Sequence, residues 1–145
     1  VRSDAPPPAP DRPLIVASMF GNTTACVTEA KKILEKQQVS NPAIIIDASH
    51  DNCKINGIKD PLQQINVANE VLNSLRLKPD LRKTVKGFMF ESFLKSGYQK
   101  IEKLTAATVD RNGLSITDPC LSWEQTEPLL LNLAAQWQEI KNANA

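Results

Sequence analysis

Three side chains of the types that bind metals or move protons follow predicted strands or a long loop. His50, the only histidine of the chain, follows one short apolar run, and Glu91 follows another. Asp118 lies in a polar, acidic stretch that precedes the last predicted helix. An imidazole and two carboxylates together suit Mn, Fe, Co or Zn. Because the carboxyl ends of parallel strands meet at one edge of a sheet, these residues can converge on one divalent cation.

Each of these residues also has a simpler interpretation. A lone strand-end histidine such as His50 is more often a surface or core-edge residue than a ligand, and Glu91 can pair with a lysine. Asp118 can serve as an Asx-type turn residue ahead of Pro119. Cys120, which precedes an apolar helix, is better interpreted as a small buried hydrophobe than as a nucleophile. The chain contains no GxxxxGK[ST], GxGxxG, GxSxG or HExxH motif, so these residues alone support only a metal-site hypothesis.

Short apolar runs, each separated by a helical pattern or a loop, predict the elements that position these residues. Strands are expected at 14–17, 43–46 and 85–90, and apolar residues recur at helical spacing within 27–34, 62–75 and 129–140. The continuous, β-branched run at 43–46 is typical of a strand covered on both faces. The order strand, helix, strand, helix, strand, loop, helix predicts an α/β fold with parallel strands and right-handed connections.

Capping signals give the expected helix boundaries. Asp60 is expected to cap the second helix, with Pro61 at its first helical position. The last helix has two candidate caps, Ser122 and Thr126, and Pro128 is tolerable only in its first turn. The polar stretch at 95–112 is long for a connection of this kind, and such loops are often functional.

Composition and charge exclude several classes of function. The 145 residues include 17 Lys and Arg against 16 Asp and Glu, and a net charge of +1 offers no field to attract nucleic acid or an anionic membrane. No apolar run is long enough to span a bilayer. The three cysteines are too few and too far apart for a disulfide framework, which favours a reducing, cytoplasmic compartment. Residues 1–13 are expected to be a proline-rich tail or linker and 14–145 a single domain; a first residue Val1 fits a processed product, a cut fragment or a tag remnant.

Three segments resemble one family closely. They are IIDASH at 45–50, GFMFES at 87–92 and GLSITDPCLSWE at 113–124. They are similar, in the same order, to the D-x-SH, G-x-M-x-ES and G-x-SITD-x-C-x-x-WE segments of the type I 3-deoxy-D-arabino-heptulosonate-7-phosphate (DAHP) synthases. The resemblance covers roughly 14–140 and the C-terminal part of the family's chain. It implies α/β units that correspond to the last three strands of a (β/α)8 TIM barrel.

The resemblance also implies an activity and its site. The family's transferases condense phosphoenolpyruvate with erythrose 4-phosphate in the first step of the shikimate pathway to aromatic amino acids, using a divalent metal. His50, Glu91 and Asp118 match three of its four metal ligands, and His50 and Asp118 are expected to be catalytic. The metal would polarise the aldehyde for attack by C3 of phosphoenolpyruvate, while water adds at C2. The fourth ligand is a cysteine near an early strand, and none of this chain's cysteines is assigned that role.

The departures from the family lead to three hypotheses. A family barrel needs eight βα units and about 250 residues, whereas three units are expected here. The family's Arg-Gly-Gly segment, which helps bind phosphoenolpyruvate, is replaced at Ala17, so the substrate-binding residues stay unknown. The chain is therefore expected to supply part of an active site that a second chain carrying the missing strands completes, or to be a truncated, inactive relative that acts as a binding or regulatory subunit. A stand-alone α/β domain that uses its metal site for another purpose is the third hypothesis. In the first two cases we expect a second chain or a homo-oligomer, because apolar strands with open edges need cover.

Overall fold

The computed structural model describes residues 23–39 and 42–143 of the chain. The proline-rich segment 1–13, the strand expected at 14–17 and the substituted position Ala17 lie outside these residues. Among the helices of the described part, none combines the length and the apolar character needed to cross a membrane.

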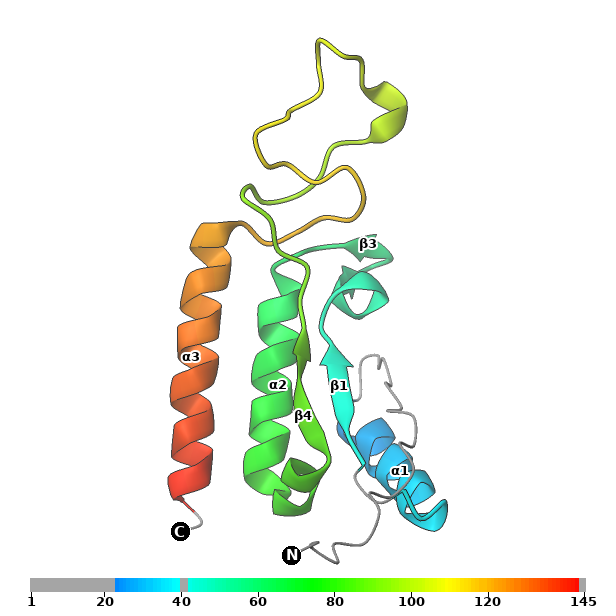
Figure 1. Ribbon diagram of the computed structural model, residues 1–145, viewed down its shortest axis with the longest axis vertical. Coiled ribbons are helices and arrows are strands. Elements are labelled where there is room, and N and C mark those ends of the chain that lie inside the picture. The colour runs from blue at the N-terminus through cyan, green and yellow to red at the C-terminus, as the bar shows by residue number, and fades with distance from the viewer. Residues whose placement is uncertain (1–22, 40–41, 144–145) are drawn as a thin grey trace, which may run out of the picture.

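Two parallel strands form the centre of the described structure (Figure 1). Strand β1 (Ile44–Asp47) pairs with β4 (Val85–Met89), with Ile44 opposite Val85 and Asp47 opposite Met89. Helix α2 (Gln63–Leu77) lies between them in the chain and packs beside them, as the predicted parallel βα units require. Both strands therefore end at the same edge, which places the residues that follow Asp47 and Met89 side by side.

Helices on either side of the strands contribute to one apolar core. Helix α1 (Thr23–Lys36) lies beside β1, and α3 (Trp123–Asn142) runs alongside α2. The core residues come from every one of these elements and from the 3-10 helix η2 (Pro79–Lys83): Leu34, Ile44, Ile46, Val71, Leu72, Leu75, Leu81, Val85 and Ile140. Burying large aliphatic side chains of this kind contributes about 1.5–3 kcal/mol each, so the core holds both strand ends in place.

The start of α2 differs from expectation, and the structure decides between the two candidate caps of the last helix. Helix α2 begins at Gln63, because Pro61 lies in a tight turn in which the Leu62 N–H donates to the carboxylate of Asp60 at 3.0 Å. Leu62 therefore precedes the helix and is exposed, although the spacing predicted it on the buried face. In α3 the cap is Ser122, whose N–H donates to Gln125 Oε1 at 2.8 Å.

With Ser122 as the cap, Pro128 is the sixth residue of α3 and lies beyond its first turn, so the expectation that it is tolerable only in that turn is wrong. The helix accommodates the proline at the cost of one backbone hydrogen bond.

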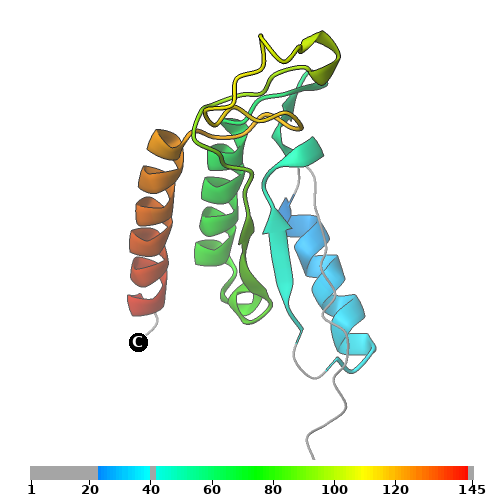
Figure 2. The same ribbon diagram turned by 45° about the horizontal axis from the view of Figure 1, so that its top comes forward.

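Two segments cover the carboxyl ends of the strands (Figure 2). After β1 come the 3-10 helix η1 (His50–Cys53) and a hairpin of β2 (Lys54–Ile55) and β3 (Ile58–Lys59). After β4 a long loop, which contains the 3-10 helix η3 (Ile101–Lys103), returns to the start of α3. These two segments contain the candidate residues His50, Glu91, Asp118 and Cys120.

Candidate metal centre

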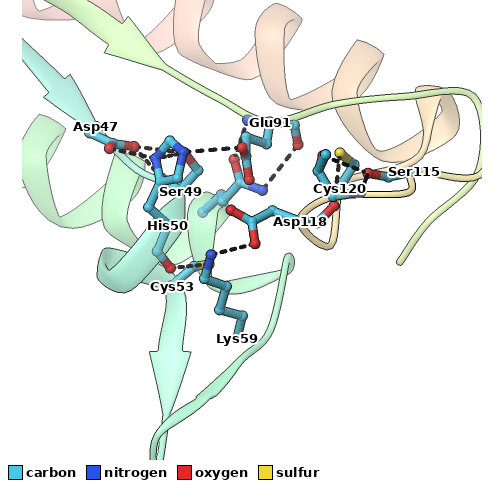
Figure 3. A network of polar contacts seen from close by, with 11 residues as sticks. Asp47, Ser49, His50, Cys53, Lys59, Glu91, Ser115, Asp118 and Cys120 are labelled. Carbon is cyan, nitrogen blue, oxygen red and sulfur yellow. Dashed lines mark hydrogen bonds and ion pairs between the residues drawn. The ribbon is translucent and has the colours of Figure 1, made fainter. Parts of the chain in front are cut away.

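His50, Glu91 and Asp118 converge at the carboxyl ends of β1 and β4 (Figure 3). One ligand atom from each lies within 4.8 Å of those of the other two, and all three side chains are half-buried. His50 follows β1 and Glu91 follows β4, so the parallel pairing of the strands brings them together. Asp118 comes from far along the chain and reaches the site through the loop.

Backbone hydrogen bonds hold the Asp118 segment against the Glu91 segment. The Leu121 N–H donates to the Glu91 carbonyl at 2.9 Å, and the Phe93 N–H donates to the Leu121 carbonyl at 2.9 Å. Further along, Gly97 and Cys120 exchange two hydrogen bonds, of 2.9 and 3.1 Å. These hydrogen bonds hold the loop beside the residues that follow β4 and so place Asp118 at the site.

Asp47 and Ser49 orient the imidazole of His50. Asp47 Oδ2 lies 2.7 Å from His50 Nδ1, and Asp47 Oδ1 accepts hydrogen bonds from the Ser49 N–H at 2.8 Å and from its hydroxyl at 2.7 Å. His50 has a φ of 51°, a left-handed conformation that few side chains adopt and that histidine tolerates. With Nδ1 bonded to a carboxylate, Nε2 is directed at the site, the arrangement in which histidines commonly bind metals.

The same contacts shift the acid–base properties of this pair. The hydrogen bond to Asp47 raises the pKa of His50 above 6.5, and the negative charges of Asp47, Glu91 and Asp118 act in the same direction. Burial favours a higher pKa for Asp47, but the hydrogen bonds from Ser49 and His50 outweigh it and hold that pKa below its ordinary value. The metal-free site therefore favours a protonated His50 beside an ionised Asp47.

Glu91 faces His50 from the neighbouring strand. Its Oε1 lies 3.2 Å from His50 Nε2, and burial raises the pKa of Glu91 above its ordinary value. Gln64, fully buried at the start of α2, accepts a hydrogen bond from the Glu91 N–H at 2.8 Å and donates one to its carbonyl at 3.1 Å. Helix α2 thus fixes the backbone from which the Glu91 carboxylate extends.

Asp118 pairs with a lysine that the sequence analysis did not identify. Lys59 Nζ lies 2.5 Å from Asp118 Oδ1 and comes from the end of the β2–β3 hairpin. The turn of this hairpin is Asn56-Gly57, with φ values of 50° and 82°, which are those of a type I′ turn. An Asn-Gly pair flanked by Ile55 and Ile58 is a strong local signal for such a hairpin, and it was available in the sequence.

The simpler interpretations have different outcomes. A lysine does pair with a carboxylate here, but its partner is Asp118, whereas Glu91 faces His50. Cys120 is buried, as predicted for a small hydrophobe, and its Sγ lies 3.4 Å from the Asp118 carbonyl. Burial also raises the pKa of the Cys120 thiol, which does not favour a nucleophile.

The residues present fit a divalent cation. One neutral imidazole nitrogen and two carboxylates form a common donor set for Mn, Fe, Co and Zn. Two ligands that each lie about 2.1 Å from a shared ion are roughly 3 to 3.4 Å apart at the angles common in octahedral or tetrahedral sites. The 3.2 Å between His50 Nε2 and Glu91 Oε1 agrees with that spacing.

Comparison with protein families and curated proteins finds DAHP synthases. The model of the DAHP synthetase I family matches residues 14–131. A Trp-sensitive phospho-2-dehydro-3-deoxyheptonate aldolase of Salmonella typhi is 39% identical over 92 residues, which cover 63% of this chain and 24% of that protein. A phospho-2-dehydro-3-deoxyheptonate aldolase of Alternaria alternata is 36% identical over 109 residues, 74% of this chain and 26% of that protein. The chain thus spans about a quarter of the length of these relatives.

A solved structure supports the same relationship. The phospho-2-dehydro-3-deoxyheptonate aldolase of Francisella tularensis superimposes with a TM-score of 0.63 at 30% sequence identity. The match covers 77% of this chain and 29% of that one.

Proposed function

Because the chain belongs to the DAHP synthetase I family, we propose that it carries one part of a DAHP synthase active site, in which phosphoenolpyruvate condenses with erythrose 4-phosphate. Membership confirms the resemblance read from the three sequence segments, and the related solved structure confirms the α/β class with parallel βα units. The observation that carries the proposal is the convergence of His50, Glu91 and Asp118, which stand in those three segments.

His50, Glu91 and Asp118 would hold a divalent cation, which is Mn, Fe, Co or Zn. Such a cation supplies Lewis-acid polarisation of a carbonyl oxygen when it is bound. The family's need for a metal and the fitting donor set both support this assignment.

The protein side chains around the triad keep its geometry in place. Asp47 holds the proton on His50 Nδ1 and leaves Nε2 free to act as a ligand. Gln64 fixes the backbone of Glu91, and the loop contacts fix Asp118. We propose His50 and Asp118 as the residues that also contact the reacting groups, because their side chains, 45% and 33% exposed, are more accessible than that of Glu91, which is 25% exposed.

The active site needs further barrel elements, and we propose that a second chain or another copy supplies them. Among the described residues, β4 pairs with a strand along only one of its edges. Next to β4 an apolar groove between α2 and α3 is lined by residues that include Leu75, Val85, Phe88, Leu133 and Trp137. An open strand edge beside an apolar groove is the surface on which a further βα unit of a barrel would pack.

The second candidate function is that of an inactive relative which binds or regulates another chain. Ala17, where the family's Arg-Gly-Gly segment is expected, favours it, because two phosphorylated substrates require cationic residues. This candidate keeps the metal centre and the assembly surface but lacks catalysis. In the part of the chain that the structure describes, Cys53 and Cys120 are buried free thiols, which supports the reducing, cytoplasmic location that we propose for both candidates.

Calorimetric titration of the chain with Mn²⁺, combined with mass spectrometry under non-denaturing conditions, tests the proposal. We expect one Mn²⁺ per chain in the wild type and no binding in His50→Ala. Full binding by His50→Ala would show that the centre is assigned incorrectly. Condensing activity in a complex with the remaining barrel supports the proposal that the chain is part of an active enzyme. An inactive, metal-loaded complex supports the second candidate, the binding or regulatory relative.

A further inference from the structure

The β2–β3 hairpin carries two lysines directly opposite each other. Lys54 and Lys59 are cross-strand partners, and like charges in such positions repel. Each lysine has an acidic partner outside the hairpin: Lys54 Nζ lies 2.6 Å from Asp51, and Lys59 Nζ lies 2.5 Å from Asp118. The two lysines differ in that only Lys59 contacts the proposed metal centre.

The hairpin is well anchored at its base and is directed at the site. The Asp60 N–H donates to the Cys53 carbonyl at 2.9 Å, and Cys53, the last residue of η1, is fully buried. Lys59 extends from this base toward Asp118, as Figure 3 shows. Its side chain is 24% exposed, so its charge is only partly screened by solvent.

A lysine in this position opposes the binding of a cation in two ways. Its ammonium is already bound to Asp118 Oδ1, an oxygen of one of the three proposed ligands. A positive charge a few ångströms from a divalent cation is also repelled, and the repulsion is larger in a half-buried site than in water. In the metal-free chain the same ammonium is favourable, because the carboxylates of Glu91 and Asp118 lie within 4.8 Å of each other.

We propose that Lys59 is an internal competitor for the cation: it neutralises Asp118 in the metal-free chain, and metal binding displaces it and releases the hairpin from Asp118. This inference rests on the proposed metal centre. It goes further by assigning a role to a residue outside the three matching sequence segments and by coupling metal occupancy to the freedom of residues 54–59.

The first test measures the affinity of the full chain for Mn²⁺ by calorimetry. Lys59→Met keeps the length of the side chain and removes its charge, so the affinity is expected to rise by roughly two- to fivefold, the range of a partly exposed ion pair. Lys59→Arg, which keeps the ion pair, is expected to bind like the wild type. Lys54→Met is the matched control, because it removes the opposite lysine of the same hairpin and is expected to leave the affinity unchanged.

The second test measures backbone hydrogen exchange in the hairpin with and without Mn²⁺. Saturating Mn²⁺ is expected to speed the exchange of residues 54–59 in the wild type and to leave it unchanged in Lys59→Met. Tighter binding by Lys59→Met without any metal-dependent exchange in the wild type would overturn the proposal, since charge alone would then explain the affinity. Unchanged or weaker binding by Lys59→Met would also overturn it.

A His50→Ala arm separates the two proposals. If the wild type binds Mn²⁺, His50→Ala does not, and Lys59→Met matches the wild type, the metal centre stands and the competitor role fails. If the wild type binds no Mn²⁺, both fail.

Discussion

Gln64 of α2 holds the backbone of Glu91 through both the oxygen and the nitrogen of its side-chain amide. Its Oε1 accepts the Glu91 N–H at 2.8 Å, and its Nε2 donates to the Glu91 carbonyl at 3.1 Å, although the two residues are 27 positions apart. The Glu91 carbonyl also accepts the Leu121 N–H at 2.9 Å. One buried amide therefore connects α2, the end of β4 and the segment that carries Asp118.

Gln64→Ala is expected to destabilise the fold and to weaken metal binding together. The substitution leaves the Glu91 N–H without its buried acceptor, which costs about 1–3 kcal/mol in the free energy of unfolding. Urea denaturation measures the first effect and Mn²⁺ calorimetry the second. Gln63→Ala is the control, because the Gln63 side chain bonds to Asn66 on the helix surface. Wild-type metal affinity in Gln64→Ala would show that Glu91 does not need this support.

Asp47→Asn is expected to weaken Mn²⁺ binding about 10- to 100-fold, as is usual when the partner of a metal-binding histidine is removed. The asparagine keeps the shape of Asp47 but loses the charge that holds the Nδ1 proton of His50. NMR titration of the metal-free variant is expected to give a lower pKa for His50 than the wild type. Asp51→Asn is the control, since Asp51 pairs with Lys54 on the surface. Equal affinities for the two variants would contradict the positioning role of Asp47.

The stability of the metal-free chain is expected to fall as the pH rises above 6.5. The folded state raises the pKa of His50 above 6.5, chiefly through the hydrogen bond to Asp47, so it holds that proton more tightly than the unfolded state does. The resulting stabilisation is complete below pH 6.5 and is lost as the pH passes through the higher folded value.

Urea denaturation in the presence of a chelator measures this dependence. His50→Gln is expected to flatten it, because the glutamine has no proton to lose in that range. A wild-type stability that rises over the same interval would contradict the direction of the His50 pKa shift.

The elements that depend on local patterns were predictable from the sequence. The apolar run before Asp47 and the helical spacing within 62–75 led to β1 and α2, and the motif residues led to the His50, Glu91 and Asp118 cluster. Local patterns suffice here because hydrophobic periodicity reports which face of an element is buried.

The missed features depend on contacts between distant segments. Gln64 is a polar residue on the buried stripe of α2, four residues before Ala68, and only its partner Glu91 explains its burial. Predicting the contact between Lys59 and Asp118 needs both the hairpin and the path of the long loop. The Asn56-Gly57 pair could have predicted the hairpin, but no local signal predicts the path of the loop. That path is determined by backbone hydrogen bonds that carry no sequence pattern.

Gly113→Ala is expected to be more destabilising than Gly97→Ala, although both glycines have a positive φ. Gly113 has a φ of 100° and Gly97 one of 88°, a region in which a side chain costs about 1–2 kcal/mol. A Cβ at Gly97 would meet no atom within 4 Å, whereas one at Gly113 would lie 2.4 Å from Leu94 Cβ. Because the Lys95 N–H donates to the Gly113 carbonyl at 2.8 Å, relief of that clash requires the backbone to move.

Urea denaturation should therefore rank the wild type above Gly97→Ala and Gly97→Ala above Gly113→Ala. Of the two variants, only Gly113→Ala is also expected to lose Mn²⁺ affinity, since Gly113 begins the segment that leads to Asp118. Equal stabilities of the two variants would mean that Leu94 moves aside without disturbing the loop, and the path of Asp118 would then not depend on this contact.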